Sequence, residues 1–324
     1  MADLRNPAVY VHGAGQQFEA GYLKRVLDSI LLGRSDDPDT ELAYFADILH
    51  VPRVPPAWIE TQATAAAEAV ARPEPTTRVF TANVAAVSAR AVVRAESAAA
   101  AIDALANPSD VREYVIGPTN ELARRAVDEA GIPKRSEDDA YRLAKKMIRR
   151  ASPAIRIEAV NVPDVAFRII LRTFAQDVLA YLFRADIRDR MRGRVRTVLR
   201  RHTGPLLVVA HSLGTIVTYD VLNAGDMRTA DVRLITLGCP LGIEDVQVRL
   251  VGGGARPIPV PAPITRWHNF AAVRDPVALS KRLATDYTRI AITDRTVDLA
   301  GVQVIEHDLD KYLALAAVKA AALS

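Results

Sequence analysis

The chain has 324 residues, of which 50% are hydrophobic and 25% are charged, a composition typical of soluble globular proteins. Its formal net charge of +4 is too small for this length to indicate a nucleic-acid-binding protein. Its single cysteine, Cys239, excludes an intrachain disulfide and favours a reducing compartment. We recognise no signal peptide and no uncharged apolar run near the roughly 18 residues that span a bilayer, and we expect a cytoplasmic protein.

The first fifty residues predict the start of an α/β domain. Residues 8–11 are a short apolar run typical of a strand, and the loop that follows contains Gly13 and Gly15, which allow a tight turn with exposed backbone N–H groups. Apolar residues recur at helical spacing over 18–32, and residues 41–49 predict a second strand.

The composition changes between residues 51 and 162. Alanine-rich helical segments replace strand signals there, and prolines and glycines divide them into several helices. We interpret 51–162 as a helical insertion into an α/β core formed by 1–50 and 163–324. The insertion could simply pack over the sheet, or it could be a cap that shapes a substrate pocket. We favour the cap, because long insertions in enzymes are often functional.

Residues 165–201 predict one long helix or two in series, rich in arginine. The arginines are Arg184, Arg188, Arg190, Arg192, Arg194, Arg196, Arg200 and Arg201. A phosphate-binding face is conceivable. However, Asp186 and Asp189 are interspersed among them, and no aromatic side chains alternate with them to stack bases. We therefore interpret the arginines as the solvated side of an amphipathic helix and predict no nucleic-acid partner.

A serine separates a strand from a helix near residue 212. Residues 206–209 are typical of a strand buried on both faces, and 215–222 have helical character. Ser212 lies between them, with Ala210 two residues before it and Gly214 two residues after it. A sharp strand-to-helix turn needs small residues at those two positions, so the stretch predicts a nucleophile elbow, G-x-S-x-G with alanine for the first glycine. The alternative is a serine that caps the helix.

Strands and helices alternate again after the elbow, which predicts a mostly parallel central sheet flanked by helices. We expect strands at residues 232–237, 264–273 and 301–305, and a closing helix at 312–323. Cys239 lies in the turn after the first of these strands. Since no histidine lies near it in sequence, we interpret it as a small buried residue and not as a nucleophile.

A serine hydroxyl needs a base to accept its proton, and that base needs an acid to orient it. Of the six histidines, His307 follows the last expected strand, where its ring can fold back over the edge of the sheet. We predict that His307 is the base, and the alternative is an exposed loop histidine. The other five lie in the glycine loop, before or beside the serine, or inside a strand: His12, His50, His202, His211 and His268.

Asp275 is the predicted acid because it follows the penultimate expected strand, in a turn stiffened by Pro276. Asp308 and Asp310 are closer to His307 in sequence, but an aspartate that close usually cannot fold back onto the ring of its neighbour. The alternative for Asp275 is a residue that only shapes its own Asp-Pro turn.

Hydrolysis through a serine also needs fixed donors for the oxyanion. The backbone N–H of Leu213 lies at the start of the helix after the elbow, and Ala14 offers the best second N–H. One such donor is worth about 3–4 kcal/mol in the transition state. The alternative, a dinucleotide cradle, fails because Gly13 and Gly15 are followed by Phe18 where the fingerprint needs a third glycine.

Together these features resemble an α/β-hydrolase of the compact lipase or esterase-like kind. The matching parts are the loop 12–15, the elbow 210–214, Asp275 and His307, in that order along the chain. The resemblance covers the core and leaves the insertion without a recognisable motif. It implies a serine hydrolase that forms an acyl-enzyme, with no metal and no cofactor.

We therefore expect Ser212 to attack a carboxylic ester of a small molecule or a lipid, His307 to move the proton, and Asp275 to orient His307. One alternative is a non-catalytic binding or interaction protein that keeps the elbow, in which His307 would lie far from Ser212. Another is a peptidase or acyltransferase with the same three residues. The amphipathic helices could also touch a membrane surface, and nothing in the sequence indicates an oligomeric state.

Overall fold

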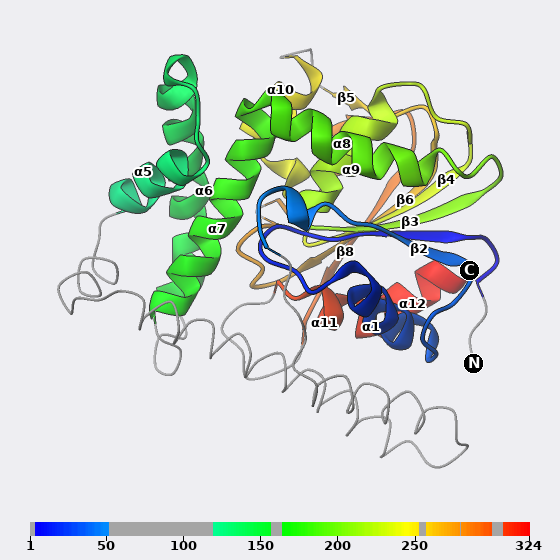
Figure 1. Ribbon diagram of the computed structural model, residues 1–324. Coiled ribbons are helices and arrows are strands. Elements are labelled where there is room, and N and C mark those ends of the chain that lie inside the picture. The colour runs from blue at the N-terminus through cyan, green and yellow to red at the C-terminus, as the bar shows by residue number, and fades with distance from the viewer. Residues whose placement is uncertain (1–3, 52–118, 157–163, 253–256, 279, 300–306) are drawn as a thin grey trace.

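A computed structural model describes residues 4–51, 119–156, 164–252, 257–278, 280–299 and 307–324 of the chain (Figure 1). Its centre is a sheet in the strand order β2-β1-β3-β4-β6-β8, in which every neighbouring pair is parallel. The strands are β1 (Ala8–Val11), β2 (Thr40–Ala43), β3 (Leu206–His211), β4 (Val232–Leu237), β6 (Ile264–Ala272) and β8 (Ile292–Val297). The predicted α/β fold with a parallel sheet is confirmed.

Helices cover both faces of this sheet (Figure 1). One face carries α8 (Ala185–Leu199) and α9 (Leu213–Asn223), and the other carries α1 (Ala20–Leu32), α11 (Leu309–Ala314) and α12 (Ala316–Leu323). Side chains of a strand alternate between faces, so Val208 belongs to one hydrophobic cluster and Leu207 to the other. All residues of β3 and β4 are buried, which explains why most of them are apolar.

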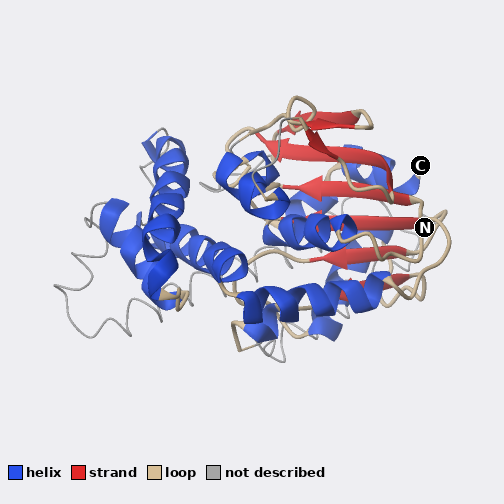
Figure 2. Cartoon of the chain, turned by 90° about the horizontal axis from the view of Figure 1, so that it is seen from above, coloured by secondary structure: helices blue, strands red, loops and turns tan. Residues whose placement is uncertain are grey.

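Three helices form a group at the end of the sheet toward which the strands point (Figure 2). They are α5 (Thr119–Glu129), α6 (Glu137–Arg156) and α7 (Asp164–Phe183), which pack on one another. Fully buried alanines, such as Ala123 and Ala140, let the helices approach closely. Helices α5 and α6 belong to the predicted insertion 51–162, and its residues 52–118 lie outside the described part of the chain.

Two small elements flank the carboxyl half of the sheet. The helix α10 (Glu244–Val251) follows the 3-10 turn η3 (Pro240–Gly242). Strand β5 (Ile258–Pro259), inside a stretch without a predicted strand, pairs in parallel with β7 (Tyr287–Thr288).

The second strand is shorter than the predicted 41–49. It ends at Ala43, and a 3-10 turn, η1 (Ala46–Ile48), follows. Between them the backbone N–H of Phe45 donates to Nε2 of His12 at 3.0 Å. The Phe45 N–H therefore bonds a buried side chain and cannot extend the hydrogen bonds between β2 and β1.

Two stretches that suggest long helices are each divided in two. Residues 165–201 form α7 and α8, one of the two predicted arrangements, because Arg184 between them has extended backbone angles. Residues 312–323 fall into α11 and α12, since Leu315 is likewise extended (φ −62°, ψ 131°). The strand expected at 301–305 lies outside the described residues.

Strand β8 has no counterpart in the prediction. It is the last strand of the sheet order, and only Ile292 of its six residues is buried. An edge strand with polar side chains carries neither the apolar run nor the clear alternation by which strands are recognised.

Candidate active site

Ser212 occupies a strained turn between β3 and α9. Its backbone has φ 53° and ψ −126°, a region that residues with a side chain rarely adopt and that costs about 1–3 kcal/mol. A Cβ on Gly214 would lie 2.3 Å from the carbonyl oxygen of His12, so this position tolerates only glycine. The Ser212 side chain makes no capping hydrogen bond to α9, which excludes the helix-cap alternative.

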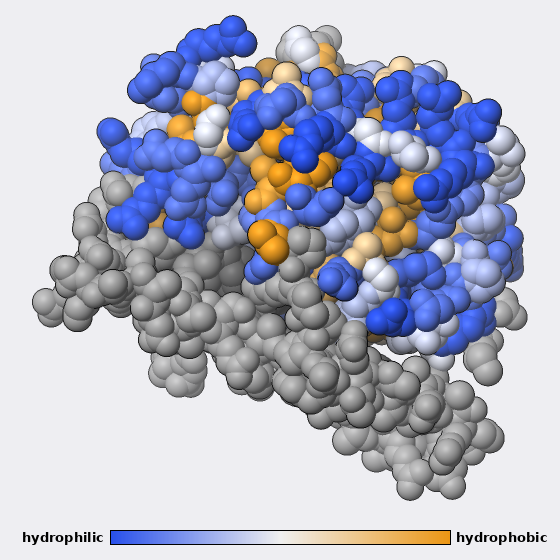
Figure 3. Space-filling model, viewed as in Figure 1, coloured by the Kyte–Doolittle hydropathy of each residue, from blue (hydrophilic) through white to orange (hydrophobic). Residues whose placement is uncertain are grey.

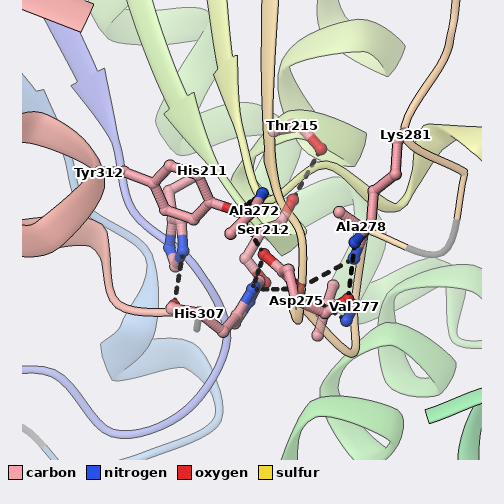
Figure 4. Close-up of polar contacts among 10 residues, drawn as sticks. All are labelled: His211, Ser212, Thr215, Ala272, Asp275, Val277, Ala278, Lys281, His307 and Tyr312. Atoms are coloured by element: carbon pink, nitrogen blue, oxygen red, sulfur yellow. Dashed lines mark hydrogen bonds and ion pairs between the residues drawn. The ribbon is translucent and has the colours of Figure 1, made fainter. Parts of the chain in front are cut away.

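A series of hydrogen bonds joins the three predicted side chains (Figure 4). Oγ of Ser212 lies 2.8 Å from Nε2 of His307, and Nδ1 of His307 lies 2.8 Å from Oδ2 of Asp275. An ionised carboxylate can only accept, so Nδ1 carries a proton. In the neutral ring Nε2 is then the acceptor for the serine hydroxyl. The carboxylate that His307 contacts is Asp275, and not the closer residues in sequence, Asp308 or Asp310.

Asp275 is held as a buried anion. Its Oδ1 accepts the backbone N–H groups of Val277 and Ala278 at 2.7 and 3.0 Å, and its Oδ2 accepts the phenol of Tyr312 at 2.6 Å. Burial by itself would raise the pKa of this carboxyl, but the charge on His307 and these hydrogen bonds outweigh burial and lower the pKa to about 2. Asp275 therefore shapes its own turn and binds His307 as well.

His211, the residue before the serine, packs directly on the predicted base. Its ring centroid lies 4.7 Å from that of His307, and its Nε2–H donates to the backbone oxygen of His307 at 3.0 Å. Burial and the neighbouring His307 lower the pKa of His211 to about 3, so its ring is neutral near pH 7. The sequence analysis named His307 and not His211 as the base, since His211 lies directly beside the serine. The contact with His307 shows that it still belongs to the site.

Two further residues of the site carry no recognisable sequence signal of their own. Tyr312 lies in the closing helical stretch and reaches Asp275 only because α11 packs under that loop. Gly238 follows β4 with φ +56°, and a Cβ there would lie 2.7 Å from Oδ2 of Asp275 and 2.8 Å from Nδ1 of His307. Its position after the strand next to β3 is the one hint that could have found it.

The two predicted oxyanion donors lie at the loops beside the serine. Leu213 is the first residue of α9, where a backbone N–H has no partner within the helix. Ala14 follows β1, which pairs with β3, and it is partly buried. A Cβ on Gly13 would lie 2.8 Å from Cβ of Ser212, so the loop containing Ala14 runs close alongside the elbow.

A carboxylate on α7 fixes this loop. The backbone N–H of Gly15 donates to Oδ2 of Asp177 at 2.7 Å. The same carboxylate lies 2.8 Å from Nε2 of His50, and the Asp177 side chain is 2% exposed. Gly15 itself has φ +85°, which a side chain would strain. Helix α7 also brings the buried Phe174 ring to 6.2 Å from the ring of His307.

Other chemical groups of the chain have structural roles. Cys239 is buried, and burial raises the pKa of its thiol to about 12, so it is not a thiolate near neutral pH. Among the described residues, no three histidine, cysteine or acidic side chains are grouped as metal ligands. No described helix combines the length and apolarity needed to cross a membrane.

The arginines of α8 mostly pair with acids. Arg188 and Arg192 contact Asp220, and Arg196 contacts Asp226. The surface that includes this helix is mostly hydrophilic (Figure 3). Such pairing is expected for the solvated side of an amphipathic helix.

Comparison of the chain with models of known protein families, with curated proteins and with solved structures finds no match.

Proposed function

We propose that the protein is a serine hydrolase of the α/β-hydrolase type that cleaves a carboxylic ester through an acyl-enzyme. The observation that carries this proposal is the hydrogen-bonded series Ser212–His307–Asp275, in which both links measure 2.8 Å. Such a series on a strained strand-to-helix turn, at the carboxyl ends of parallel strands, is the arrangement that nucleophilic acyl transfer requires.

In the proposed reaction, Oγ of Ser212 attacks the ester carbonyl carbon while Nε2 of His307 takes its proton. The carbonyl oxygen becomes an oxyanion that the N–H groups of Leu213 and Ala14 stabilise. The intermediate collapses, the C–O bond to the alcohol breaks, and His307 returns the proton to the leaving alkoxide. Water then attacks the acyl-enzyme by the same steps in reverse, which releases the acid and frees Ser212.

The electrostatics of the site support these roles. Asp275 stays ionised throughout the neutral range because its pKa is about 2, so it can stabilise the imidazolium that forms at each proton transfer. Its fixed contact with Nδ1 leaves Nε2 of His307 facing the serine. The neutral ring of His211 adds no competing charge beside the imidazolium.

The binding-protein alternative predicted a His307 far from Ser212, and the 2.8 Å contact between them favours the hydrolase instead. The helices α5, α6 and α7 lie at the end of the sheet toward which the strands point (Figure 2), and Ser212 follows the carboxyl end of β3, which supports a substrate-shaping role for this part of the chain. Cofactors are not needed, since every proposed step uses groups of this chain and water.

A fluorophosphonate probe tests the nucleophile. We expect it to label the wild-type protein and not the Ser212→Ala variant. Ser29→Ala on α1 is the matched control, because Oγ of Ser29 bonds only the backbone oxygen of Arg25 and its loss should leave labelling intact. Labelling that survives Ser212→Ala would refute the assignment of the nucleophile.

A panel of p-nitrophenyl esters with short and long acyl chains, together with amide and thioester analogues, tests the reaction. We expect ester turnover that disappears in Ser212→Ala and falls strongly in Asp275→Asn. Rapid labelling combined with no ester turnover, but with cleavage of the amides or transfer to an added acceptor, would replace the esterase by a peptidase or an acyltransferase.

A further inference from the structure

A group of basic side chains lies on one face of the sheet, on the strands β4, β6 and β8. Arg233 of β4 pairs in register with Arg266 of β6, and His268 lies two residues further along β6. His268 pairs with Thr293 of β8, and Arg295 lies two residues beyond Thr293. Because residues two apart in a strand share a face and neighbouring strands are about 4.8 Å apart, Arg233, Arg266 and His268 stand together, and Arg295 lies on the same face about 13 Å further along the strands than Arg266. We name Arg233, Arg266, His268 and Arg295 the basic cluster.

The cluster is rich in positive charge that no carboxylate pairs. Among the described residues, Arg233, Arg266 and Arg295 form no ion pair, whereas most arginines of α8 do. The pKa of Arg233 is lowered by burial and by the charges of Arg266 and Arg5. Burial also lowers the pKa of His268, and the three arginines lower it further. The like charges therefore repel one another across the sheet.

The acid that acts on Arg233 does not cancel this excess of positive charge. Asp231, which precedes β4, acts on Arg233 in the opposite sense, but it ranks behind burial and both neighbouring arginines. Its Oδ1 is also engaged by the hydroxyl of Thr265 at 2.6 Å. The cluster thus keeps a net positive charge near neutral pH.

Buried donors in the cluster are only partly used. Arg233 is 9% exposed, and its Nη2 donates to the backbone oxygen of Ala322 at 3.3 Å, near the carboxyl end of α12. This contact accounts for one of its five N–H groups as a helix cap. Its Nε is buried without a partner among the described residues, as is Nδ1 of His268. Buried polar atoms without partners are costly, and an anion bound to the exposed arginines beside them would offset part of that cost for the charged guanidinium of Arg233.

We propose that the basic cluster binds the phosphate group of a small ligand. Guanidinium groups match phosphate oxygens in bidentate fashion, and a dianion would offset the repulsion among the arginines. The exposed Thr293 hydroxyl stands on the same face as a further donor. The basic cluster spans roughly 10 Å across the three strands and roughly 13 Å along them, which long arginine side chains can bridge around one small phosphorylated ligand, whereas duplex-binding surfaces contact about 6–10 phosphates. The site is therefore sized for a small ligand.

This inference is independent of the proposed hydrolase. The cluster begins at the second residue of β4 and the third of β6, while Ser212 follows the carboxyl end of β3. A ligand bound at the cluster would not touch the serine.

Calorimetric titration with inorganic phosphate and with glycerol phosphate tests the site, in the full-length protein at constant ionic strength with chloride as the reference anion. We expect saturable binding that weakens about tenfold in Arg266→Gln and again in Arg295→Gln, the size of one charged hydrogen bond. Both side chains are exposed, so the fold should survive. Arg190→Gln is the matched control, since Arg190 is an exposed arginine on α8 outside the cluster.

Binding that is absent, or that weakens equally in Arg190→Gln, would overturn the proposal. A second measurement follows the imidazole protons of His268 by NMR, identified through His268→Gln. A bound phosphate should raise the pKa of His268 and shift its signals at constant pH, and an unchanged titration would also overturn the proposal.

Two more arms distinguish the source of the phosphate group. Vesicles of phosphatidylcholine with and without phosphatidic acid test a lipid headgroup, and retention only on the acidic vesicles, lost in Arg266→Gln, would identify that source. Binding of glycerol phosphate without vesicle retention would identify a soluble ligand. Binding of duplex DNA through these arginines, without binding of either phosphate probe, would overturn the small-ligand site.

Discussion

The phenol of Tyr312 connects the predicted acid to the sheet, and its removal is a sharp test of the site. The hydroxyl donates to Oδ2 of Asp275 at 2.6 Å and accepts the backbone N–H of Ala272 at 2.7 Å, and the side chain is fully buried. Tyr312→Phe keeps the ring in place and removes both hydrogen bonds. We predict a less stable protein with a less reactive serine.

The magnitude follows from the two lost contacts. A hydrogen bond to a charged group contributes about 1.5–3 kcal/mol, and a buried N–H left unpaired costs about 1–3 kcal/mol. Both contacts depend on one oxygen, so their costs overlap, and we expect the free energy of unfolding to fall by about 2–4 kcal/mol. Asp275 keeps its bonds to His307 and to two backbone amides. A share of about 1.4 kcal/mol felt at His307 would slow labelling of Ser212 about tenfold.

Urea unfolding and the rate of fluorophosphonate labelling measure the two effects. Tyr219→Phe is the matched control, because this buried phenol donates to an uncharged oxygen, that of Pro259, at 3.1 Å. It should lose about 1 kcal/mol of stability and keep the wild-type labelling rate. If Tyr312→Phe matched the wild type in both measurements, or if both variants lost reactivity equally, Tyr312 would not support the acid.

Three further predictions concern the surroundings of the site. Gly238→Ala should slow fluorophosphonate labelling of Ser212 about a hundredfold, because the added Cβ would displace the Asp275 carboxylate and the His307 imidazole. Circular dichroism should show an unchanged fold, and labelling at the wild-type rate would contradict the prediction. Asp177→Asn weakens the bond to the Gly15 N–H and should lower kcat/KM for esters about tenfold while circular dichroism shows an unchanged fold; an unchanged kcat/KM would show that this contact does not position the loop. Burial lowers the pKa of His12 to about 4 and that of His211 to about 3, so between these values and about 6.5 the unfolded chain binds more protons than the native one. The free energy of unfolding should therefore fall on acidification by about 1.4 kcal/mol per pH unit for each histidine, and urea midpoints that stay flat from pH 7 to pH 5 would contradict it.

The central strands were predictable because a strand that is buried on both faces consists mainly of apolar residues. Leu206 to Val209 form an uninterrupted apolar run and four of the six β4 residues are apolar, and the structure buries both strands throughout. Strand β8 has no apolar run, because Ile292 is its one buried residue. Its pairing with β6 depends on the tertiary structure and cannot be predicted from a six-residue polar segment.

The order of chemistry-bearing residues along the chain predicted which side chains the structure brings together. Ser212 and Asp275 follow β3 and β6, whose carboxyl ends lie at one edge of the sheet, while the strand predicted before His307 at 301–305 lies outside the described residues. Tyr312 and Gly238 could not be found this way. The Tyr312 contact depends on how α11 packs against the loop of Asp275, and the Gly238 contact depends on how closely the turn after β4 approaches the Asp275 carboxylate. Neither distance can be predicted from local sequence.

The supporting contacts explain how Ser212 keeps its unfavourable backbone. His211, next to the serine, donates to the backbone of His307, while Tyr312, five residues beyond His307, donates to Asp275. Each of the three segments is thus tied to another by a residue outside the Ser–His–Asp series. A conformation that costs about 1–3 kcal/mol persists only where its surroundings over-determine it. Loss of one tie should therefore loosen the whole series rather than a single side chain, which is why Tyr312→Phe is expected to affect a serine that it does not touch.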